Sequence, residues 1–172
     1  MENLNDEIAN NTMIYQICSD MCLGSYQITG VIGPDEKNQW WLEYDKSRFI
    51  QIPIPEQTRN ELYKTIILIR DKSGMTRTEL LYAMCLLRKI WAQGSQQINP
   101  IVLQTLVVGA CIVAQKMIVD GAYPNWWWAR QLEVPLECIH SMENKILNAL
   151  DYKTHVNKEE IETMNRQFHD NK

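Results

Sequence analysis

The sequence predicts an all-α fold, a bundle of five helices packed around a buried central helix. Glycine and proline are scarce, with 7 and 6 among 172 residues, which disfavours an all-β or repeat-rich chain. From Glu56 onward, apolar residues recur at the three- and four-residue spacing of amphipathic helices. One stretch, residues 101–119, is apolar nearly all round, so we expect other helices to surround it.

The first 55 residues are expected to form a helix and an extended arm that packs on the main domain. Apolar residues at helical spacing predict a short helix over residues 12–22, at Met13, Ile14, Ile17, Cys18 and Met21. Residues 23–55 contain turn signals, and near their end Ile50, Ile52 and Ile54 alternate with Gln51 and Pro53. Period-two alternation with prolines favours an extended segment or edge strand rather than a sheet.

The bundle itself is assigned to residues 56–156. Its first helix covers residues 56–70 with Leu62, Ile66 and Ile69 on one stripe, and Ser73-Gly74 ends it. Thr76 and Glu79 have the spacing of a capping box, which starts a second helix that reaches residue 93. The inner face of this second helix is predicted to carry Leu80, Met84, Leu87 and Trp91.

Polar and proline signals bound the remaining helices. Asn99-Pro100 is a cap and first-turn proline for a third helix, which runs to residue 120 and is ended by Gly121. Asn125 is expected to cap a short helix over residues 126–132. A fifth helix starts at Val134-Pro135 and runs to Leu150, with an inner face of Leu136, Ile139, Ile146, Leu147 and Leu150. Asn157 with Glu160 starts a last helix within residues 157–172.

Composition limits the environment and the partners of this chain. Lys and Arg number 17 against 21 Asp and Glu, a net charge of −4. This balance argues against nucleic acid or an anionic membrane as partner, since both attract basic surfaces. The five cysteines cannot all pair, which favours reduced thiols in the cytoplasm or nucleus. Polar side chains interrupt the apolar run 101–119, so we do not expect a membrane span.

The sequence contains no recognised catalytic or phosphate-binding motif. The three histidines lie on separate predicted elements. Cys18 and Cys22 lie one helical turn apart, but a structural zinc site needs four ligands and no second pair is suitably spaced. We therefore expect neither a cofactor nor a metal, and we do not expect an enzyme.

Two charges and a tryptophan cluster are unusual in their positions. Lys116 lies within the apolar run and Glu143 within the apolar pattern of the fifth helix; the alternative for both is a solvated helix surface. Asp120 follows Lys116 by four residues, which would place both on one helical face. The three indoles of Trp126–Trp128 cannot all face one way, so at least one should reach the surface.

Several short pieces, taken in order, resemble a known family. They are Leu81-Tyr82-Ala83, Leu86-Leu87-Arg88-Lys89, Val108–Lys116, Asp120, Asn125, Trp128-Ala129-Arg130, Val134-Pro135-Leu136-Glu137, Met142-Glu143, Leu150-Asp151-Tyr152 and His155-Val156. Together they resemble the cyclin box, in particular that of the single-box P/U-type cyclins, a class that includes the cyclin Y relatives. The resemblance covers roughly 100 of the 172 residues and implies a cyclin-box bundle.

The resemblance also implies a function. In cyclins, a lysine that ends the third box helix and a glutamate in the fifth hold a protein kinase near its regulatory C-helix, and Lys116 and Glu143 match those positions. Asp120, Asn125 and Trp128 match further family positions and are expected at the same kinase-binding site. The expected partner is a cyclin-dependent serine/threonine kinase, bound as a heterodimer. The alternatives are a cyclin-fold adaptor that binds another protein and, from a third class, an enzyme.

Overall fold

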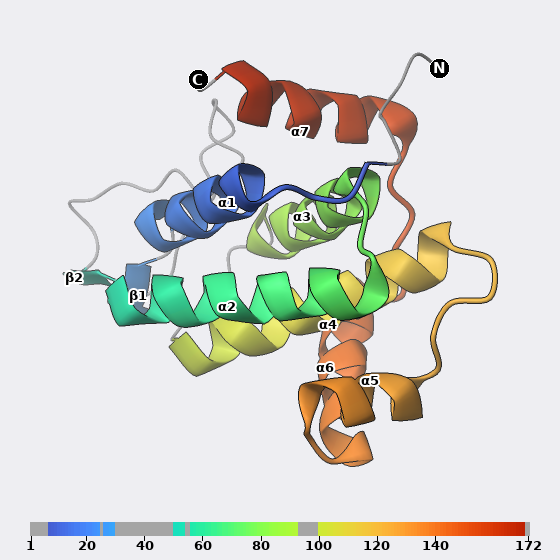
Figure 1. The fold of residues 1–172 in the computed structure, drawn as a ribbon. Helices are drawn as coiled ribbons and strands as arrows, with labels where there is room; N and C mark the ends of the chain where they lie inside the picture. The colour runs from blue at the N-terminus through green and yellow to red at the C-terminus, as the bar shows by residue number, and fades with distance from the viewer. Residues whose placement is uncertain (1–6, 25, 30–49, 54–55, 93–99, 171–172) are drawn as a thin grey trace.

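The computed structural model describes residues 7–24, 26–29, 50–53, 56–92 and 100–170. These residues form helices joined by short connections, together with one two-stranded ribbon, and the all-α prediction is confirmed (Figure 1). In chain order the elements are α1 (Asn11–Gly24), β1 (Tyr26–Thr29), β2 (Ile50–Pro53), α2 (Glu56–Ser73), α3 (Arg77–Ala92), α4 (Pro100–Ile118), α5 (Asn125–Leu132), α6 (Leu136–Ala149) and α7 (Lys158–Asp170).

Side-chain caps set the starts of three helices. The Thr76 hydroxyl accepts from the Glu79 amide at 3.2 Å, while the Glu79 carboxylate accepts from the Thr76 amide at 2.9 Å. The same reciprocal pair joins Asn157 and Glu160 at the start of α7. Both predicted signals are therefore confirmed, because each side chain satisfies an amide that the first helical turn leaves without a partner. At α1, the Asn10 side chain accepts from the Met13 amide at 2.8 Å.

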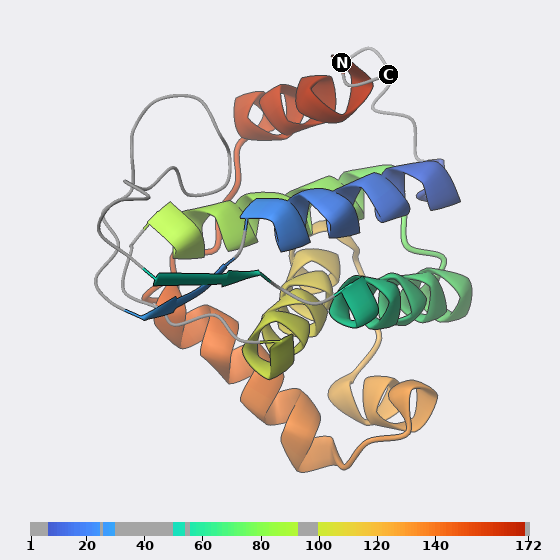
Figure 2. The same cartoon turned by 90° about the vertical axis from the view of Figure 1, so that its left-hand side faces the viewer.

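The core is centred on two helices rather than one. α4 is buried through its middle turns, as predicted, but its last turn reaches the surface at Lys116, Met117 and Ile118. α3 packs against α4 on one side and α7 on another, and it buries far more than the predicted inner face of Leu80, Met84, Leu87 and Trp91. Figure 2 shows α7 covering one end of the molecule and α5 and α6 forming the other.

The N-terminal segments join this core. All five predicted apolar positions of α1 are buried in the same cluster as the bundle residues: Met13, Ile14, Ile17, Cys18 and Met21. The backbone just before α1 pairs with the turn between α2 and α3, where Ala9 N donates to Met75 O at 3.1 Å and Arg77 N donates to Glu7 O at 2.8 Å. Arg70 adds a bond to Ala9 O at 3.1 Å. α1 therefore shares one hydrophobic core with the helices that follow it.

The arm differs from the prediction. β1 and β2 pair antiparallel, with Tyr26 opposite Pro53 and Thr29 opposite Ile50. The alternating pattern correctly placed a strand at residues 50–53, but the expectation that it would not form a sheet was wrong. Its partner is remote in sequence, and local periodicity carries no information on such pairing. The rest of the predicted arm, residues 25, 30–49 and 54–55, and the predicted cap Asn99 lie outside the described residues.

Tyr82 attaches the segment between α6 and α7 to α3. Its hydroxyl donates to Thr154 O at 2.7 Å and accepts from Val156 N at 3.2 Å, and the side chain is buried. Burial also raises the pKa of this phenol. One hydroxyl thus satisfies two backbone groups of the segment that connects α6 to α7.

Tyr82→Phe should lower the free energy of unfolding by about 1–3 kcal/mol, because it leaves a buried amide and a buried carbonyl without partners. Tyr152→Phe is the matched control, since Tyr152 is 66% exposed, and it should change little. Urea denaturation of both variants measures the effect. Equal stability of the two variants would show that the Tyr82 bonds contribute nothing net.

Candidate functional site

Three of the predicted site residues meet at one point on the surface. Lys116 comes from the last turn of α4, Asn125 is the first residue of α5, and Glu143 lies within α6. The Lys116 Nζ donates to Asn125 Oδ1 at 2.6 Å and to Glu143 Oε2 at 2.7 Å. We call these three residues the polar cluster. The two charges that seemed misplaced in apolar patterns are therefore partners of each other.

The polar cluster is half-buried and keeps unused hydrogen-bonding capacity. The side chain of Lys116 is 33% exposed and that of Glu143 is 17% exposed. The ammonium has three N–H donors, of which Asn125 and Glu143 take two. The second carboxylate oxygen of Glu143 receives no bond from the described residues. An adjacent donor and acceptor can therefore be offered to an incoming polar group.

Asn125 and Asp120 do not behave as predicted. α5 has Pro124 as its N-cap and makes no side-chain cap bond, so Asn125 does not cap α5, and its oxygen serves Lys116 instead. α4 ends at Ile118, so Asp120 lies beyond the helix and shares no helical face with Lys116. Gly121, with φ of 71°, turns the chain after the helix has already ended. Asp120 is exposed and forms no ion pair with the described residues.

The tryptophan cluster divides between core and surface. Trp126 is 56% exposed, whereas Trp128 is 1% exposed. The Trp128 side chain therefore lies in the hydrophobic core of this chain, and its place at a kinase-binding site stays a prediction. Its indole packs edge-on to Trp127, with ring centroids 5.1 Å apart. A run of three aromatic residues predicts this division but not which ring is buried, because that depends on the packing of α5.

Apolar side chains are exposed close to the polar cluster in the chain. Met117 and Ile118 follow Lys116 directly and are 46% and 38% exposed. Tyr123, two residues before Asn125, stacks on Trp127 with ring centroids 3.7 Å apart. Leu136, predicted to face the core, is also exposed. Sequence reasoning missed Tyr123; its place beside the tryptophan run was the only available signal.

Sequence reasoning also missed Gly109 on α4. A Cβ atom at this position would lie 2.4 Å from the carbonyl oxygen of Met142 on α6. α4 and α6 therefore approach closely one residue from Glu143. The available signal was a glycine within a buried helix, where it weakens the helix and implies a packing reason.

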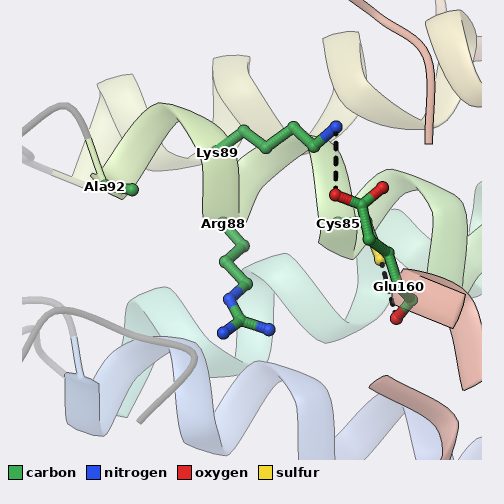
Figure 3. A pocket seen from close by; sticks show the side chains of 5 residues that line it. All are labelled: Cys85, Arg88, Lys89, Ala92 and Glu160. Atoms are coloured by element: carbon green, nitrogen blue, oxygen red, sulfur yellow. Dashed lines mark hydrogen bonds and ion pairs between the residues drawn. The ribbon is translucent and has the colours of Figure 1, made fainter. Parts of the chain in front are cut away.

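A hollow lies between α3 and α7 (Figure 3). It has a volume of about 320 Å³ and is lined by Cys85, Arg88, Lys89, Ala92 and Glu160. Lys89 Nζ is held by His155 O at 2.7 Å and by Glu160 Oε1 at 3.3 Å, and Arg88 points away from that pair (Figure 3). Burial, and next the Glu160 carboxylate, raise the pKa of the Cys85 thiol to about 12. This thiol is therefore protonated at neutral pH and is not an activated nucleophile.

Other kinds of site find no support within the described part of the chain. No group of three or more His, Cys, Asp or Glu side chains there could hold a metal ion. None of the described helices combines the length and the hydropathy that crossing a membrane requires. No known family model matches the sequence, and no curated protein gives a significant match.

Two buried thiols predict a loss of stability at alkaline pH. Burial raises the pKa of Cys111, like that of Cys85, to about 12, while a thiol in an unfolded chain titrates near ~8.5. Above about pH 9 the unfolded chain releases protons that the native state keeps, so the free energy of unfolding falls as pH rises. Each thiol contributes at most about 1.4 kcal/mol per pH unit.

Urea denaturation between pH 7 and pH 10.5 measures this dependence, and the Cys85→Ala/Cys111→Ala double variant should show a shallower decline than the natural protein. Val107→Ala, another truncation in the core, is the control and should lower stability equally at every pH. An unchanged slope in the double variant would contradict the assignment of the decline to these thiols.

Proposed function

We propose that this chain is a cyclin-type regulatory subunit that binds a serine/threonine protein kinase. The observation that carries the proposal is the polar cluster itself. The family resemblance assigns Lys116 and Glu143 to kinase binding. The Lys116 Nζ lies 2.7 Å from Glu143 Oε2, although 27 positions separate the two residues in the chain. Asn125, from the same resemblance, completes the cluster.

The chemistry of the polar cluster suits recognition of a partner's backbone. The free N–H of Lys116 can donate to a carbonyl, and the free oxygen of Glu143 can accept from an amide. Helix ends expose such groups, with unpaired amides at the N-terminus and unpaired carbonyls at the C-terminus. A kinase C-helix held through such groups would keep the ion pair that positions ATP. The subunit would perform no chemistry and would shift the kinase toward its active conformation.

The surroundings of the polar cluster fit a protein interface. The centres of such interfaces are apolar and enriched in aromatic residues and methionine, with polar groups that fix the register. Met117, Ile118 and Tyr123 provide exposed apolar surface next to the cluster residues in the chain. The pair itself adds little to folding, because partly exposed ion pairs contribute about 0–1 kcal/mol. Its loss should therefore affect binding more than stability.

Lys116→Ala and Glu143→Gln should each weaken kinase binding by about 2–5 kcal/mol, because the remaining partner is left desolvated and unpaired in the complex. The measurement is affinity capture of the tagged full chain from its native cells, followed by protein-kinase assay and mass spectrometry. Lys145→Ala and Glu137→Gln are matched controls for the two changes of charge. Both residues are exposed on α6, the helix that carries Glu143.

Capture of one kinase by the natural protein and both controls, with loss in folded Lys116→Ala and Glu143→Gln, is the expected result. If the two site variants unfold instead, the cluster is structural and the proposed site is wrong. A folded natural protein that captures no kinase activity would overturn the proposed function. Other captured proteins would then favour the adaptor alternative.

A further inference from the structure

Gly109 lies where α4 crosses α6, at a point with no room for a side chain. A Cβ atom placed there would lie 2.4 Å from Met142 O and 3.0 Å from Ile146 Cγ1. Both distances are well below ordinary van der Waals contact between such atoms. By contrast, a Cβ atom at Gly74 or Gly121 would meet nothing within 4 Å. Of Gly74, Gly109 and Gly121, Gly109 is therefore the glycine at which the absence of a side chain serves packing between helices.

The atom that Gly109 faces cannot move alone. Met142 O belongs to the backbone of α6, where carbonyls bond to the amide four residues later. A side chain at position 109 would therefore displace α6 as a body rather than rotate one side chain. Such overpacking is not relieved by a change of rotamer.

The crossing lies next to the polar cluster on both helices. Gly109 and Lys116 are seven residues apart on α4, which is about two turns, so they lie on nearly the same face. On α6, Met142 directly precedes Glu143. A displacement of α6 away from Gly109 thus carries Glu143 away from Lys116, whose Nζ is 2.7 Å from the carboxylate.

We propose that Gly109 is a positioning residue for the polar cluster. Its missing side chain sets the approach of α4 and α6 at which Lys116 and Glu143 form their ion pair. The role of Gly109 in the geometry of the polar cluster is inferred without reference to a partner, whereas an effect on kinase binding rests on the function proposed above. Gly109 touches no partner and acts only through the spacing of the two helices.

The test is carbodiimide coupling, which joins an amine to a carboxylate only when the two are in contact. In the natural protein, mass spectrometry should find the Lys116–Glu143 cross-link and, as an internal standard, the Lys89–Glu160 cross-link between α3 and α7, where nitrogen and oxygen are 3.3 Å apart. In Gly109→Ala the ratio of the first yield to the second should fall about tenfold or more, because such reactions weaken steeply when the groups separate by about 1 Å.

Gly74→Ala is the matched control. It lowers stability through its backbone, since Gly74 has a φ of 67° that alanine tolerates poorly, but it lies away from the α4–α6 crossing. The cross-link ratio should stay at the natural value in this variant. A ratio that is unchanged in Gly109→Ala, or lowered equally in Gly74→Ala, would overturn the positioning role.

If Gly109→Ala loses both cross-links, the experiment is repeated in an osmolyte that favours the folded state. Loss of both even there would make Gly109 a requirement for folding and overturn the positioning role; recovery of the internal standard alone would support it. Kinase capture separates this inference from the proposed function. A natural protein that captures no kinase, with the expected cross-link ratios, would leave Gly109 as a positioning residue and remove only the function.

Discussion

The close approach of α4 and α6 at Gly109 is the contact on which the candidate site depends. Met142 O occupies the space that any side chain at position 109 would need. A glycine within a helix costs roughly 0.5–1 kcal/mol relative to alanine, and the chain accepts this cost at a buried crossing. The crossing positions Lys116 and Glu143, which extend from the two helices just beyond it. The Lys116 Nζ lies 2.7 Å from Glu143 Oε2.

The remaining helices hold this pair of helices in place. α3 packs along α4, and α7 covers α3. The described cysteines Cys18, Cys85, Cys111 and Cys138 are free, so this packing does not depend on disulfides between them. Tyr82 fixes the chain between α6 and α7 through two backbone bonds, and Arg70 fixes the residues before α1. Each of these contacts joins segments that are far apart in sequence. The surface around Lys116 is thereby built on rigid elements, which favours precise recognition.

The polar cluster illustrates a difference between stability and recognition. A half-exposed ion pair stabilises a fold only weakly, and an apolar pair at the same positions would pack at least as well. The kinase contact proposed above would give a recognition role to Lys116 and Glu143, which lie near the exposed apolar side chains Met117 and Ile118. The amide of Asn125 orients the ammonium without adding charge, so the site keeps one donor and one acceptor free.

Local chemistry in the sequence determined the helical class, most helix boundaries and the buried face of α1. Capping boxes act within four residues, and the Thr76–Glu79 and Asn157–Glu160 pairs formed as predicted. Tertiary structure decided what depends on distant segments: the pairing of β1 with β2, the second central helix, the burial of Trp128 and the transfer of Asn125 from cap to Lys116 acceptor. Periodicity reports which face of an element is apolar, but only packing fixes which element covers that face and how closely two backbones approach.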